Sequence, residues 1–77
     1  MSEAEYAELY GPPAMNAPHA VGQTLFYDEN GQVENGEILY VAACDPQTGE
    51  PNLHYIVSPA EAGFPTPIWP EQIITVM

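Results

Sequence analysis

The chain has 77 residues, the size of one small domain. It contains 11 Asp and Glu residues and 0 Lys or Arg, so its formal net charge is −11. Because phosphate contacts require cationic side chains, this composition argues against nucleic-acid binding and disfavours an anionic membrane surface. Only His19, His54 and the N-terminal amine offer the acids a positive charge within the chain.

Residues 1–20 are predicted to form a short helix followed by an extended, proline-rich segment. Ser2 and Glu5 have the spacing of a capping box, and a glycine and two prolines at 11–13 end the helix. A helix of this length is not stable alone in water, so we expect it to dock on the domain or on a partner. Its apolar residues fall at i, i+3 and i+4 and form one predicted docking stripe: Tyr6, Leu9 and Tyr10.

Residues 21–77 are predicted to form a β domain, because β-forming runs alternate with turn signals. Asn-Gly pairs end at Gly31 and at Gly36, so residues 28–36 are interpreted as an irregular hairpin loop. Pro70 suits the first position of a helical turn. The expected elements are strands at 23–27, 37–44, 53–58 and 68–69, a helical turn at 70–72 and a last strand at 74–77.

Five short antiparallel strands with one helical turn before the last strand describe a small, strongly bent barrel. The residues that carry a family resemblance are VGQTLFY at 21–27, GQVENGEILYV at 31–41, HYIVS at 54–58 and GFPTPIWPEQII at 63–74. This pattern resembles the SH3-like small barrels, in particular the Tudor, chromo-barrel and KOW type. The resemblance implies a mainly β fold over residues 21–77. Many Tudor and KOW members carry a basic surface or an aromatic cage, and this chain lacks the basic surface.

Both faces of the expected strands carry apolar side chains. Uninterrupted alternation divides the second strand into two groups, Leu39, Val41 and Ala43 against Ile38, Tyr40, Ala42 and Cys44. It divides the last strand into Ile74 and Val76 against Ile73, Thr75 and Met77. A barrel interior covers one face of each strand, so we expect the docking stripe or a second copy of the chain to cover the other. The C-terminal stretch comprises residues 53–77. It is expected to be held by apolar packing of Tyr55, Val57, Phe64, Ile68, Trp69 and Ile73.

The sequence offers no convincing catalytic or metal-binding set. The spacing of His19, Cys44 and His54 matches no zinc pattern, and residues 28–34 lack the glycine and glutamate positions of an EF-hand loop. A nucleophile pair of Cys44 and His54 would have no neighbouring cation to stabilise a thiolate. We therefore predict a protein without catalytic residues, cofactor or bound metal, which is not an enzyme.

The aromatic residues allow two interpretations. In the first, the aromatic rings line a shallow groove that binds extended peptides or cationic side chains. In the second, the rings form the core of the domain. The small size of the chain favours the core, because a small domain needs most of its aromatic rings inside. The candidate partner-binding residues are Tyr27, Tyr40, Tyr55, Phe64 and Trp69.

The expected function is that of a small, acidic, non-catalytic interaction module. Its partner would be a basic protein or peptide, or a second copy of the chain in a homodimer. The alternative is an acidic DNA mimic that inhibits a nucleic-acid-binding protein; the even spread of the acids along the chain favours the module. A single cysteine, Cys44, excludes an internal disulfide, and there is no secretory signal or apolar run of about 20 residues. These features predict a soluble, cytoplasmic protein.

Overall fold

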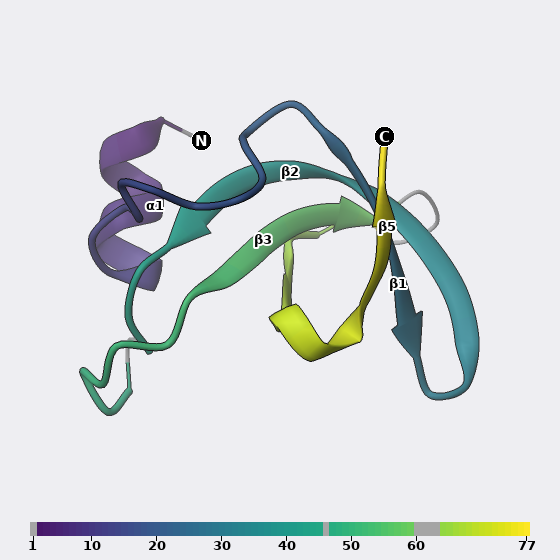
Figure 1. Ribbon diagram of the computed structural model, residues 1–77. Helices are drawn as coiled ribbons and strands as arrows, with labels where there is room; N and C mark the ends of the chain where they lie inside the picture. The colour runs from purple at the N-terminus through teal and green to yellow at the C-terminus, as the bar shows by residue number, and fades with distance from the viewer. Residues whose placement is uncertain (1, 46, 60–63) are drawn as a thin grey trace.

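Five antiparallel strands form one sheet in the order β4-β3-β2-β1-β5 (Figure 1). The computed structural model describes residues 2–45, 47–59 and 64–77, so parts of two expected loops, at 46 and 60–63, lie outside the described residues. The mainly β fold with an N-terminal helix and a 3-10 turn before the last strand confirms the predicted fold class. The elements are α1 (Glu3–Tyr10), β1 (Thr24–Glu29), β2 (Gln32–Ala42), β3 (His54–Pro59), β4 (Thr66–Ile68), η1 (Pro70–Gln72) and β5 (Ile73–Val76).

The predicted capping box begins α1. The Glu5 N–H donates to Ser2 Oγ at 3.3 Å, and the Ser2 N–H donates to Glu5 Oε1 at 3.2 Å. These two bonds satisfy backbone donors that the first turn of a helix leaves open. The hydrogen bonds from Ser2 also lower the pKa of Glu5 below 4.5, because they favour the ionised carboxylate. The helix ends where the Gly11 N–H donates to Ala7 O at 2.9 Å.

A two-residue turn joins β1 to β2. Glu29 pairs with Gln32, and Asn30 and Gly31 between them both have positive φ, at 53° and 83°. Two left-handed residues in succession make the type I′ turn that suits the twist of a hairpin. The predicted irregular loop over 28–36 is therefore wrong: the first Asn-Gly pair closes the hairpin by itself, and β2 continues through the second pair.

Gly36 lies inside β2, where the neighbouring strand leaves no room for a side chain. A Cβ at this position would lie 2.6 Å from the Ser58 carbonyl oxygen of β3. We expect Gly36→Ala to lower the free energy of unfolding by about 1–3 kcal/mol, because the two strands must move apart. Urea denaturation followed by circular dichroism measures this loss. Asn35→Ala, at the exposed neighbouring position, is the control, and an equal midpoint for both variants would contradict the steric argument.

Two β-bulges shift the faces of the strands. Ile38 pairs with Val57 and Tyr40 pairs with Ile56, so Leu39 is an extra residue on β2. Ile38 and Val41 consequently face the same cluster, and the predicted uninterrupted alternation in this strand is wrong.

A second shift falls between β1 and β5. Phe26 pairs with Thr75 and Tyr27 with Ile73, so Ile74 is the extra residue. Ile73 and Val76 therefore both pack against the core, whereas Ile74 is 55% exposed. The predicted grouping of Ile74 with Val76 is wrong for the same reason as in β2.

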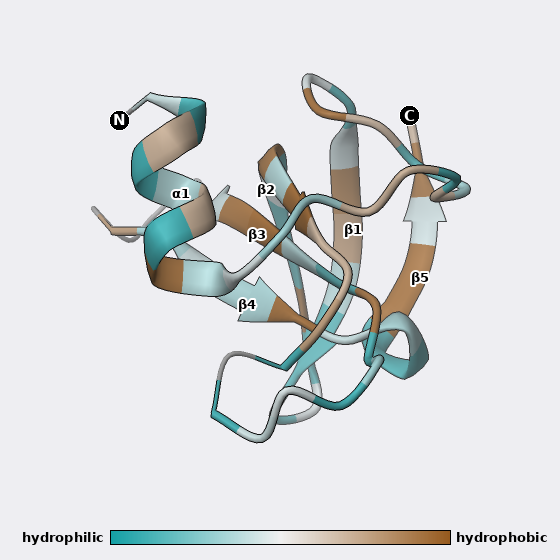
Figure 2. Cartoon of the chain, turned by 90° about the vertical axis from the view of Figure 1, so that its left-hand side faces the viewer, coloured by the Kyte–Doolittle hydropathy of each residue, from teal (hydrophilic) through white to brown (hydrophobic). Residues whose placement is uncertain are grey.

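Apolar side chains form one cluster on each face of the sheet. The main cluster consists of Leu25, Tyr27, Ile38, Val41, Tyr55, Val57 and Ile68. The helix-side cluster consists of Tyr40, Ala42 and Ile56, with Tyr6, Ala7 and Tyr10 of α1 packed against it. Figure 2 shows hydrophobic residues on the strands and a largely hydrophilic α1 beside them.

The structure separates the members of two predicted sets. Of the docking stripe, Tyr6 and Tyr10 pack on the helix-side cluster, whereas Leu9 is 56% exposed. Of the residues expected to hold the C-terminal stretch, Tyr55, Val57 and Ile68 lie in the main cluster with Ile73 against it. Phe64 is 70% exposed, so its predicted packing is wrong. Phe64 precedes β4 and has no paired strand position to turn it inward.

Candidate functional site

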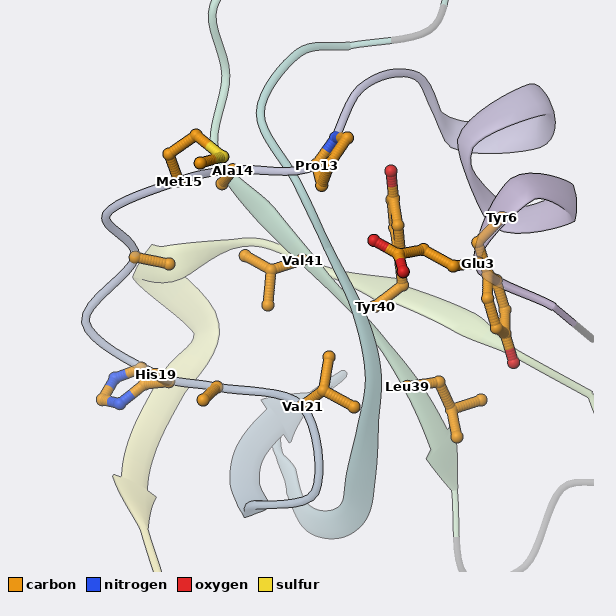
Figure 3. A pocket seen from close by; sticks show the side chains of 12 residues that line it. Glu3, Tyr6, Pro13, Ala14, Met15, His19, Val21, Leu39, Tyr40 and Val41 are labelled. Atoms are coloured by element: carbon orange, nitrogen blue, oxygen red, sulfur yellow. The ribbon is translucent and has the colours of Figure 1, made fainter.

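An apolar groove of about 530 Å³ lies beside β2. Residues 13–21 form one wall, Glu3 and Tyr6 of α1 form the other, and Leu39, Tyr40 and Val41 of β2 lie between them (Figure 3). This volume is within the range of about 300–1,000 Å³ that is typical of ligand pockets.

Backbone hydrogen bonds fix both ends of the segment that forms the first wall. At one end the Ala14 N–H donates to Val41 O at 2.9 Å, and at the other the Gly22 N–H donates to Ile38 O at 2.9 Å. Ala14 and Ala17 turn toward the main cluster. The predicted extended linker is therefore packed along the edge of β2 that β1, beginning at Thr24, leaves open.

Large apolar side chains of the groove remain in contact with solvent. Met15 is 86% exposed and Val21 is 60% exposed, and Leu39 is half-buried at the β2 bulge. Scattered exposed apolar residues are ordinary on a protein surface, but three that line one hollow offer a surface that an apolar group would cover.

The end of the groove next to α1 is aromatic and acidic. The Tyr40 hydroxyl donates to Gly11 O at 2.7 Å, and the Tyr6 ring stacks on the Tyr40 ring with centroids 5.5 Å apart. Glu3 extends toward Tyr40 (Figure 3). Burial raises the pKa of Tyr40, and the negative charge of Glu3 raises it further.

The opposite end of the groove is formed by His19. Its ring lies against the ring of Tyr55, with centroids 5.6 Å apart. Burial raises the pKa of Tyr55, and a hydrogen bond from the backbone of His19 partly offsets this rise. The contact ties the first wall to the main cluster beneath it.

The structure does not bring the five predicted aromatic residues into one groove. Tyr27, Tyr40 and Tyr55 are 0%, 3% and 1% exposed, so the prediction that they form an open binding surface is wrong. Tyr27 and Tyr55 face the main cluster, and Tyr40 lies on the opposite face. The core interpretation holds for these three because strand alternation points their rings into the two apolar layers. Phe64 and Trp69 remain at least partly exposed.

Trp69 lines a second, more polar hollow of about 460 Å³, together with Asp45 and Glu71. The ring of His54 lies against the indole, with centroids 4.5 Å apart, and its Nδ1 is 2.9 Å from Asn52 O. His54 is 2% exposed, so its ring serves as packing for Trp69. The surface of this hollow is about equally polar and apolar, so the more apolar groove is the stronger candidate for a binding site.

Comparison of the chain with protein-family models, with curated proteins and with solved structures finds no match. Within residues 2–45, 47–59 and 64–77, no group of three or more His, Cys, Asp and Glu residues is arranged to hold a metal ion. The helices described here are also too short to cross a membrane.

Sequence reasoning missed the residues that define the groove. Met15 lies in the stretch interpreted only as linker, although a large apolar residue in a proline-rich segment is a signal of packing or binding. Val21 opens the predicted β domain just before its first expected strand, and no role was predicted for its side chain. Leu39 was assigned to a regular strand, and no local signal marks it as the extra residue of a bulge.

The three buried tyrosines are expected to make the fold sensitive to alkali. Burial is the main cause that raises the pKa of Tyr27, Tyr40 and Tyr55 above 10.0. Because the folded pKa exceeds the unfolded pKa, their contribution to stability is complete below pH 10.0 and is lost as pH rises through the folded values. We expect tyrosinate absorbance and loss of the far-ultraviolet circular dichroism signal to develop together in this range.

Tyr27→Phe is the matched variant for this titration. Among the described residues, the buried Tyr27 hydroxyl has no hydrogen-bond partner, so its removal leaves no other group unsatisfied. The variant should unfold at a higher pH than the native chain, since one buried phenol no longer ionises. Complete tyrosine ionisation in a chain that is still folded would contradict the assignment of the three rings to the core.

Proposed function

We propose that this protein is a small, acidic, non-catalytic interaction module whose partner presents a basic surface. The observation that carries the proposal is the complete absence of Lys and Arg beside 11 acids. The acids that the structure shows as exposed lie on α1, on the β1–β2 hairpin and at other surface positions: Glu3, Glu5, Glu8, Asp28, Glu29, Glu37, Glu50 and Glu71. Such a surface attracts cationic partners and repels anionic ones.

The distribution of these acids supports a module over a DNA mimic. A mimic needs carboxylates in rows that follow the phosphates of a duplex, about 7 Å apart along each strand. Here the exposed acids are scattered over several elements. An apolar groove, which a duplex surface does not have, adds to the support for a protein partner.

We also propose that the chain is an SH3-like small barrel that acts in the cytoplasm. Support for the fold relationship comes from five antiparallel strands, a bent β2 and a proline-led 3-10 turn before β5. Support for the compartment comes from Cys44, which is a free thiol and suits a reducing interior.

Affinity capture with a charge-neutralised control tests the module. The control carries Asp28→Asn, Glu29→Gln, Glu50→Gln and Glu71→Gln, all at exposed positions away from the groove. We expect purified partners to have basic surfaces, to bind the control more weakly and to lose affinity between about 50 and 300 mM salt. Affinity that is independent of both salt and the four acids would overturn the proposal. A partner that releases DNA in proportion to the added protein would establish the mimic instead.

A further inference from the structure

We propose that the groove beside β2 binds an extended segment of the partner in which an apolar side chain lies next to a lysine or arginine. This inference rests on the proposed function and names the site and the chemistry of its ligand. Three observations support it: the size of the groove, its apolar surface and the carboxylate of Glu3 in its lining.

The size of the groove favours an extended segment over a helix. Its volume is about 530 Å³. One turn of a helix about 11 Å wide and 5.4 Å long already occupies roughly 510 Å³, so a bound helix of three or more turns would extend well beyond the groove. Two or three side chains of an extended chain fit this space, with alternate side chains pointing inward.

The apolar surface of the groove supplies the contact for an inward-pointing side chain. This surface is formed by Met15 and Val21 of the segment 13–21 and by Leu39 of β2. Met15 and Val21 are largely exposed to solvent. Aliphatic side chains that enter the groove would remove part of this apolar surface from water, which is the main favourable term in such binding.

Charge selects the neighbouring residue of the ligand. Among the described residues that line the groove, Glu3 is the only acid, and it lies at the end formed by α1 and Tyr40. The chain has no Lys or Arg with which Glu3 could pair. A cation on the bound segment would gain both this carboxylate and the field of the remaining acids, whereas an acidic residue there would be repelled.

The inference is tested with the full chain and an acetylated hexapeptide that alternates lysine and leucine. Binding is measured by calorimetry and by amide chemical-shift changes in nuclear magnetic resonance. Two control peptides replace either every lysine by glutamine or every leucine by glycine. We expect the largest shift changes at residues 13–21 and 39–41, and weaker binding of both control peptides.

Matched variants distinguish binding in the groove from the general electrostatic attraction between the acidic protein and a basic peptide. Glu3→Gln is expected to weaken binding about two- to fivefold, and Met15→Gln about fivefold, because one loses an ion pair and the other an apolar contact. Glu71→Gln removes the same charge outside the groove, and Phe64→Gln removes an apolar side chain outside the groove that is also largely exposed, at 70% against 86% for Met15. Both controls should change affinity by less than a factor of about 1.5.

The outcomes distinguish the two proposals. If Glu3→Gln and Glu71→Gln weaken binding equally, attraction to basic partners survives and the groove is overturned as the site. If the basic peptides do not bind and no basic partner is found by capture, the proposed function fails as well. If the same amides shift when the protein alone is concentrated, a second copy of the chain occupies the groove and the basic segment is overturned as its ligand.

Discussion

Ile56→Ala is expected to lower the free energy of unfolding by about 2–5 kcal/mol. Ile56 of β3 is 0% exposed and belongs to the helix-side cluster, against which α1 packs. Truncation removes buried methylene and methyl groups and leaves a cavity in this cluster. At about 0.05–0.15 kcal/mol per residue, a chain of 77 residues has a total stability of about 4–12 kcal/mol, so the loss is a large share of it. Urea denaturation measures the change.

Ile74→Ala makes the same chemical change at a site that is 55% exposed. Its expected cost is below about 1 kcal/mol, because Ile74 is the extra residue of a bulge and leaves no buried cavity. Equal losses for the two variants would contradict the assignment of Ile56 to a packed core on the helix side of the sheet.

Removal of residues 2–10 is expected to destabilise the domain and to promote self-association. This deletion uncovers Tyr40, Ala42 and Ile56 and removes the packing of Tyr6 and Tyr10. Two tyrosine-sized side chains at about 1.5–3 kcal/mol each set an upper estimate of roughly 3–6 kcal/mol. The segment from Pro12 to Gln23 stays, because it bonds to β2 and contributes Ala14 and Ala17 to the main cluster. Light scattering over a range of concentrations should show a higher mass than the full chain.

Point variants control for the loss of chain length. Tyr6→Ser combined with Tyr10→Ser should reproduce the association, whereas Leu9→Ser, at a position that is 56% exposed, should not. A shortened chain with unchanged stability and mass would show that α1 does not serve as the cover of this face.

The strands were predictable from the sequence, but their faces were not. Turn signals and β-forming runs located all five strands, although β2 begins at Gln32 in a stretch predicted as a loop and β4 overlaps its prediction at Ile68 alone. Leu39 and Ile74, however, each add one residue to a ladder, and one extra residue reverses the face of every position beyond it. Bulges depend on how a neighbouring strand packs, so the local sequence carries no clear signal for them.

The candidate site was less predictable than the fold. Aromatic residues indicate burial as readily as binding, and three of the five candidate rings are in the core. The groove depends on residues 13–21 folding back onto an edge of β2 that has no strand partner there, which is a tertiary contact. What the sequence did predict is the sign of the charge around the groove, because composition alone determines it.

The position of Pro67 has a consequence for behaviour at high concentration. β4 is an outer strand of three residues, and Pro67 at its centre has no amide hydrogen to donate. Fibrils grow when an outer strand templates the next molecule through a continuous row of donors and acceptors, which β4 does not provide. At high concentration, β4 of one molecule would therefore not pair with a strand of the next. Pairing between sheets of different molecules is expected at β5, the other outer strand of the sheet.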